Sequence, residues 1–235
     1  MQRRIFLLGV LLLGWALTTA AANPPPLRSA KNPARPLAFN GGRFSDLAIG
    51  AKDEAVGTIV GAGSVSVLYG TLNRLGVSNN QYWTQNLIGG ADASEQYDHF
   101  GRALAIGDFD GDGYRDLAIG IPYETVGSVN FAGAVHILYG LNSSTGLSAT
   151  GNQFWHQDST GMNGAAEQDD HFGWALAAGD FNGDGYDDLA IGVPDENIGT
   201  ISNAGGVHVM YGSSGGLTTT NNKIWHQDEE TSGDP

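Results

Sequence analysis

Short apolar runs separated by glycine-rich turns fill the chain from Leu37 onward. In the middle of the chain these runs are Phe100–Gly107, Leu117–Ile121, Ala134–Tyr139 and Gln153–Gln157. In the third run Val135 and Ile137 alternate with His136 and Leu138, and a period of two places the two pairs on opposite faces of a strand. The pattern therefore predicts an all-β chain built from groups of four short strands.

The group of runs recurs along the chain. The sequence Asp-Leu-Ala-Ile-Gly begins at Asp46, Asp116 and Asp188, at steps of 70 and 72 residues. Each group also carries one equivalent tryptophan: Trp83, Trp155 or Trp225. Four antiparallel strands per repeat form the blade of a β-propeller, and a linear stack of tandem repeats is the competing architecture.

The repeat and the sequence before it predict six segments. A basic start at Arg3 and Arg4, an apolar stretch and a small-residue cleavage site indicate a secretory signal peptide. The segments are a signal peptide at 1–22, a Pro-rich linker at 23–36, an incomplete first blade at 37–85, a second blade at 86–157, a third blade at 158–227, and the start of a truncated next repeat at 228–235. We expect a secreted protein, extracellular or periplasmic, with no membrane span after signal cleavage, because the apolar stretch is short and no stop-transfer charge follows it.

Two acidic turns carry the clearest chemistry. Residues 108–116 read Asp-Phe-Asp-Gly-Asp-Gly-Tyr-Arg-Asp, and residues 180–188 read Asp-Phe-Asn-Gly-Asp-Gly-Tyr-Asp-Asp. Oxygen-bearing side chains at positions 1, 3, 5 and 9 can converge, and the glycines at positions 4 and 6 permit the positive φ of a tight turn. An all-oxygen donor set suits Ca²⁺. A solvated Asp/Gly turn is the alternative, and two copies of the full pattern argue against it.

These turns differ from an EF-hand. Position 12, where an EF-hand has a bidentate Glu, is Ile119 or Ile191, inside an apolar run typical of a strand. We therefore expect each turn to close a β-hairpin, with the carbonyl of the position-7 tyrosine as a further ligand. The predicted ligands of the two Ca²⁺ sites are Asp108, Asp110, Asp112, Tyr114 and Asp116, and Asp180, Asn182, Asp184, Tyr186 and Asp188.

The combined motifs resemble FG-GAP repeats, the blades of the integrin α-subunit head and of related secreted bacterial proteins. The resemblance is carried by Phe100-Gly101, Phe172-Gly173, the Ala132–Ala134 segment and the two acidic turns, and it covers residues 37–227. It implies a Ca²⁺-bound, normally seven-bladed propeller, of which about 2.7 blades are present here. We therefore expect a fragment of a longer array, with closure by other copies or another chain as the alternative.

The first copy departs from the family pattern. Ala38 and Gly42 replace two acidic positions, and Arg43 places a positive charge where a cation would bind. We expect no tight metal site there. Pro33 and Pro36 interrupt the preceding run, so this blade is expected to lack its first strand.

Composition narrows the class of partner. The formal net charge is −14, with 25 acidic against 11 basic residues, which disfavours nucleic acid and anionic lipid. The chain has no cysteine, which excludes disulfides and favours a bacterial secreted origin over an animal one. The equivalent tryptophans suggest blade packing, with a glycan-binding surface stripe as the alternative.

Little in the sequence points to catalysis. All six histidines form repeat-related pairs: His99 with His171, His136 with His208, and His156 with His226. Gly212–Gly216 matches the Gly-x-Ser-x-Gly esterase elbow, but its repeat counterparts are plain turns. We expect a non-catalytic, secreted Ca²⁺-binding module for adhesion or for binding a protein or glycan. The alternative is an accessory region of a secreted hydrolase, phospholipase D-like or glycan-active, whose catalytic domain is not in this chain.

Overall fold

The computed structural model describes residues 38–89, 92–141 and 145–227. The predicted signal peptide, Pro-rich linker and start of a further repeat lie outside these residues. Within the described ranges no helix is long and apolar enough to cross a membrane.

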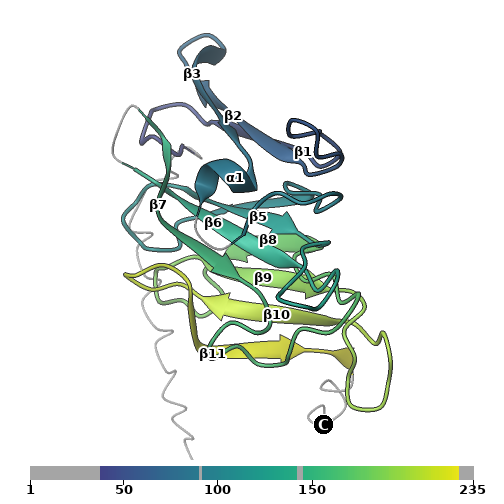
Figure 1. The fold of residues 1–235 in the computed structure, drawn as a ribbon. Helices are drawn as coiled ribbons and strands as arrows, with labels where there is room; N and C mark the ends of the chain where they lie inside the picture. The colour runs from purple at the N-terminus through teal and green to yellow at the C-terminus, as the bar shows by residue number, and fades with distance from the viewer. Residues whose placement is uncertain (1–37, 90–91, 142–144, 228–235) are drawn as a thin grey trace, which may run out of the picture. The chain divides into compact units, whose positions relative to one another are not determined.

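The described residues form three antiparallel sheets (Figure 1). The first sheet contains β1 (Leu47–Ala51), β2 (Ser64–Gly70) and β3 (Leu75–Trp83). The second contains β4 (Ala103–Gly107), β5 (Asp116–Ile121), β6 (Ala134–Gly140) and β7 (Leu147–Trp155). The third contains β8 (Ala175–Gly179), β9 (Asp188–Val193), β10 (Gly206–Tyr211) and β11 (Thr218–Trp225). A short helix, α1 (Gln85–Ile88), follows the first sheet. In each sheet consecutive strands pair as neighbours, so the all-β prediction and the four-stranded blade are confirmed.

Two predicted strand boundaries are wrong. The first strand of the second sheet begins at Ala103, because Phe100 and Gly101 belong to a turn in which Arg102 N donates to His99 O. The fourth strand begins at Leu147 rather than at Gln153. Its polar first half pairs with β6 across a bulge between Ile137 and Tyr139, so a hydrophobic pattern alone does not reveal it.

Neighbouring sheets pack face to face, and the apolar core lies between them. One cluster joins Val65 and Val67 of β2 to Leu117 and Ile119 of β5. A second cluster joins the equivalent residues of β6 and β9 across the next junction. Every residue of β6 is buried, because the second sheet is covered on both faces. This explains why the two alternating sets of β6 side chains, which the sequence pattern places on opposite faces, both lie in apolar surroundings.

Candidate metal centre

Each acidic turn closes a hairpin between the first two strands of a sheet. Residues 108–116 connect β4 to β5, where Gly107 pairs with Asp116. Residues 180–188 connect β8 to β9, where Gly179 pairs with Asp188. No helix flanks either turn. The glycines at positions 4 and 6 have φ values between +69° and +99°, which Cβ-bearing residues rarely adopt.

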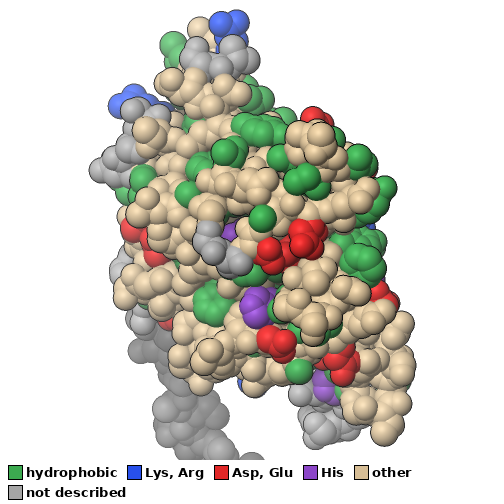
Figure 2. Space-filling model, viewed as in Figure 1, with side chains coloured by type: hydrophobic (Ala, Val, Ile, Leu, Met, Phe, Trp, Pro, Cys, Tyr) green, Lys and Arg blue, Asp and Glu red, His purple; other side chains and the backbone are tan. Residues whose placement is uncertain are grey.

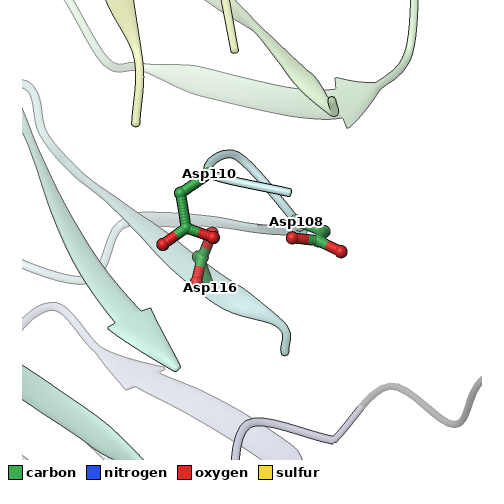
Figure 3. Close-up of side chains that lie close together, drawn as sticks. All are labelled: Asp108, Asp110 and Asp116. Atoms are coloured by element: carbon green, nitrogen blue, oxygen red, sulfur yellow. The ribbon is translucent and has the colours of Figure 1, made fainter. Parts of the chain in front are cut away.

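Three carboxylates of the first turn converge. One oxygen from each of Asp108, Asp110 and Asp116 lies within 4.8 Å of the other two. Figure 3 shows these three side chains. Asp112 is not part of this group; its Oδ1 accepts the backbone N–H of Tyr114 at 2.8 Å. The structure thus brings together three of the five predicted ligands of this turn, and Asp112 N donates to Asp110 Oδ1 at 3.1 Å.

The electrostatics of this group favour a cation. Asp116 is fully buried, and burial, followed by the charge of Asp110, raises its pKa to about 8. The pKa values of Asp108 and Asp110 are also raised, chiefly by burial. Such carboxylates resist ionisation because burial removes part of their hydration and each faces other negative charge. A divalent ion would remove that penalty, and the all-oxygen donor set fits Ca²⁺.

The second turn is more open. Asp180, Asn182 and Asp184 are exposed, and the Asp180 carboxylate accepts backbone N–H groups of the turn. Asn182 Nδ2 donates to Asp184 Oδ2 at 2.9 Å, and Tyr186 N donates to Asp184 Oδ1 at 3.0 Å. These hydrogen bonds hold the side chains of the turn against its own backbone. Among the described residues the three-carboxylate cluster forms in the first turn and not in the second.

The position-9 aspartate has a second task, which the sequence does not reveal. Asp116 accepts Phe109 N at 2.7 Å and Gly140 N at 2.9 Å. Asp188 makes the same pair of bonds in the third sheet, and Asp46 makes them in the first. The first copy lacks acidic residues at positions 1 and 5, yet Asp46 still makes both hydrogen bonds. The position-9 carboxylate therefore stabilises the hairpin even where the other metal ligands are missing.

The two turns are linked to each other, a contact that sequence reasoning missed. Asp187 Oδ2 accepts Asp108 N at 2.8 Å and Arg115 Nη1 at 2.7 Å. Asp187 N in turn donates to Asp108 O at 2.9 Å. The sequence does carry a signal for this contact: at position 8 of the two turns, consecutive repeats have residues of opposite charge, Arg115 and Asp187. Since Asp108 is a predicted ligand, the second turn helps to fix the first.

Another repeated acidic group lies away from the turns, where neighbouring sheets meet. Glu124 and Gln85 are fully buried, and Gln85 Nε2 donates to Glu124 Oε2 at 2.5 Å. Burial, followed by the charge of Asp98, raises the pKa of Glu124 to about 10. Gln157 and Glu196 form the same pair at the next junction, so this is a structural feature of the repeat.

We predict that Glu124→Gln makes stability less dependent on pH between about 4.5 and 10. In the native protein Glu124 keeps its proton over this range, whereas in the unfolded chain it is ionised. The folded state therefore binds more protons, and stability falls as the pH rises, by at most about 1.4 kcal/mol per pH unit for one proton. Urea unfolding from pH 6 to 9 measures this slope. The control is Glu54→Gln, which replaces an exposed repeat counterpart; parallel pH profiles for the native protein and Glu124→Gln would contradict the assignment.

The histidines and tryptophans occupy repeated positions. His136 and His208 are buried, and burial lowers the pKa of each to about 4. His171 Nδ1 lies 2.9 Å from Asp195 Oδ2. Trp155 packs against an apolar cluster and Trp83 against another, while Trp225 is 48% exposed. Gly212–Gly216 lies in the connection from β10 to β11, where Ser213 Oγ donates to Gly216 O.

Comparison with known proteins identifies these sheets. The family model described as FG-GAP repeat matches residues 100–138 and 172–210, which include both acidic turns. Integrin alpha-3 of Cricetulus griseus is 33% identical over 132 residues, which are 56% of this chain and 11% of that protein. Phosphatidylinositol-glycan-specific phospholipase D of Homo sapiens is 33% identical over 186 residues, 77% of this chain and 18% of that protein. The rat phospholipase D is 34% identical over 132 residues, 56% of this chain and 15% of that protein.

The chain thus spans less than a fifth of the length of these relatives. The resemblance seen in the Phe-Gly turns and acidic loops is confirmed by the family match. The chain therefore contains FG-GAP repeats at residues 100–138 and 172–210, and its sheets are β-propeller blades similar to segments of integrin α subunits and of phosphatidylinositol-glycan-specific phospholipase D.

Proposed function

We propose that this chain is a secreted, Ca²⁺-binding β-propeller module that binds another macromolecule and performs no chemistry. The convergence of Asp108, Asp110 and Asp116 within 4.8 Å carries the proposal. In the second turn, Asp180, Asn182, Asp184 and Asp188, with the Tyr186 carbonyl, would supply the corresponding donors. Bound Ca²⁺ would hold each hairpin closed and stabilise the blades by mass action.

The class of partner follows from charge and from the relatives. Acidic side chains outnumber basic ones on the face shown in Figure 2, in keeping with the net charge of −14. Such a surface argues against nucleic acid and anionic membranes. Similarity to integrin alpha-3 favours a protein or glycan ligand and an adhesive role. Similarity to a phospholipase D over 77% of this chain favours the second candidate, an accessory region of a secreted hydrolase.

Calorimetric Ca²⁺ titration of the chain without residues 1–22 tests the metal assignment. We expect two sites with dissociation constants of about 10⁻⁴–10⁻³ M. The first turn should bind more tightly, because it offers four carboxylates against three and an amide. Asp110→Ala should remove the tighter site and Asp184→Ala the weaker one, whereas Asp53→Ala, at an exposed acid outside both turns, should change neither.

Two results would contradict the proposal in different ways. A chain that takes up no Ca²⁺ at millimolar concentration would remove the metal function altogether. Two sites of equal affinity, or a tighter second turn, would leave Ca²⁺ binding intact but overturn the argument from ligand charge.

A further inference from the structure

One residue of the second acidic turn holds the first predicted ligand of the first turn. Asp187 is position 8 of the second turn, and its neighbours Tyr186 and Asp188 are both predicted ligands. Its Oδ2 accepts Asp108 N at 2.8 Å and Arg115 Nη1 at 2.7 Å. Its own N–H donates to Asp108 O at 2.9 Å. Both backbone polar groups of Asp108 are therefore bonded to Asp187.

The ion pair in this contact is partly shielded from water. The side chains of Arg115 and Asp187 are 27% and 22% exposed, so salt screens their attraction less than that of a fully exposed pair. Arg115 is position 8 of the first turn, with the predicted ligands Tyr114 and Asp116 as its neighbours. The pair thus joins the two backbone segments that carry predicted ligands of both turns.

A ring contact lies beside the ion pair. The Tyr186 ring covers the backbone of Gly111, position 4 of the first turn, where an added Cβ would lie 2.5 Å from Tyr186 Cε1. At the preceding pair of copies Arg115 N donates to Ala38 O at 3.3 Å, which is the same backbone contact between consecutive turns. The Asp187 side chain adds two hydrogen bonds to that contact at the place where two predicted metal sites meet.

Such a contact can transmit order from one turn to the other. Fixing the backbone and the ligand side chains of a turn around an ion costs conformational entropy. A turn that is already ordered by an ion holds its side of the shared contact in place, so the other turn loses less freedom when it binds in its turn. By linkage, the effect on affinity is the same in both directions.

We propose that the two acidic turns bind Ca²⁺ with positive coupling, and that Asp187 is the positioning residue that transmits it. The inference rests on the proposed function, because it requires both turns to bind Ca²⁺. Occupancy of either site should raise the affinity of the other about fivefold. Repulsion between the two ions acts in the opposite direction, and salt at about 0.15 M weakens it.

Calorimetric Ca²⁺ titration of single-site variants measures the coupling. Asp184→Ala leaves the first site and Asp110→Ala leaves the second. In the chain without residues 1–22 and at about 0.15 M salt, each remaining site should bind about fivefold more weakly than in the native chain, and by the same factor. Asp53→Ser, at an exposed acid outside both turns, removes one charge as a control and should leave the coupling unchanged.

Two substitutions at position 187 test the route. Asp187→Ser introduces the residue type that the first copy has at this position, Ser45, and should abolish the coupling, so that removing one site no longer weakens the other. Asp187→Asn should keep the coupling, because a single oxygen accepts both Asp108 N and Arg115 Nη1 and an amide oxygen can do the same.

Hydrogen exchange in chelator provides a second readout, without any metal. The Asp108 amide should exchange at least about tenfold faster in Asp187→Ser than in the native chain, and at the native rate in Asp187→Asn.

The possible failures are distinguishable. A chain that takes up no Ca²⁺ would overturn the proposed function and the coupling together. Two sites that bind independently in the native chain would leave the proposed function intact and overturn the coupling alone. Unchanged coupling in Asp187→Ser, or its complete loss in Asp187→Asn, would overturn the assignment to the shared oxygen of Asp187.

Discussion

Asp116→Ala is expected to lower the free energy of unfolding by about 2–4 kcal/mol even when a chelator removes all Ca²⁺. The substitution leaves the backbone N–H groups of Phe109 and Gly140 without their acceptor. The site is fully buried, so water cannot replace the carboxylate. Each unsatisfied buried donor costs about 1–3 kcal/mol.

Asp110→Ala is the matched variant, because it removes a predicted ligand with little part in the fold. Asp110 is partly exposed, and its Oδ1 accepts the neighbouring Asp112 N at 3.1 Å. In chelator we expect a change below about 1 kcal/mol. In millimolar Ca²⁺ the variant should instead lose the stabilisation that the ion gives the native chain. Urea unfolding with and without Ca²⁺ measures both. Equal losses for the two variants in chelator would contradict the separate structural task of Asp116.

The two acidic turns could be predicted because their information is local. Nine consecutive residues carry the donors and the glycines that wrap them, so residues 108–116 and 180–188 stand out from the sequence. The second task of Asp116 could not be seen, because its partner Gly140 lies 24 residues away on another strand. The link from Asp187 to Asp108, 79 residues apart, likewise depends on how neighbouring blades pack.

The same reasoning separates the fold features that were predicted from those that were not. The blades could be predicted from the repeated apolar runs, because the apolar residues that each strand buries recur in every repeat. The start of β7 at Leu147 was missed, since its first half is polar and is held by pairing to β6 rather than by burial. The buried Gln85–Glu124 pair joins residues 39 apart, and a lone Glu in a loop gives no sign that it will be enclosed.

Phe109→Ala should cost about 3–5 kcal/mol, whereas Phe181→Ala should cost less than about 1 kcal/mol. Both phenylalanines occupy position 2 of an acidic turn, and the two turns differ in sequence only at positions 3 and 8. Phe109 is fully buried in the cluster that includes Leu189, Met210 and Leu217 of the third sheet and its turn. Phe181 is 53% exposed. The difference therefore lies in the following blade, which covers one ring and not the other.

Thermal and urea unfolding in chelator measure the two variants without any contribution from bound metal. Truncating a buried ring removes its transfer free energy and leaves a cavity, while an exposed ring loses little. Phe39, the position-2 residue of the first copy, is also fully buried and belongs to the cluster between the first and second sheets, so Phe39→Ala should behave like Phe109→Ala. Similar losses for Phe109→Ala and Phe181→Ala would mean that the ring acts within its own turn. A large difference would instead place the stability of each blade in its contact with the next one, which is the contact that the third sheet leaves open.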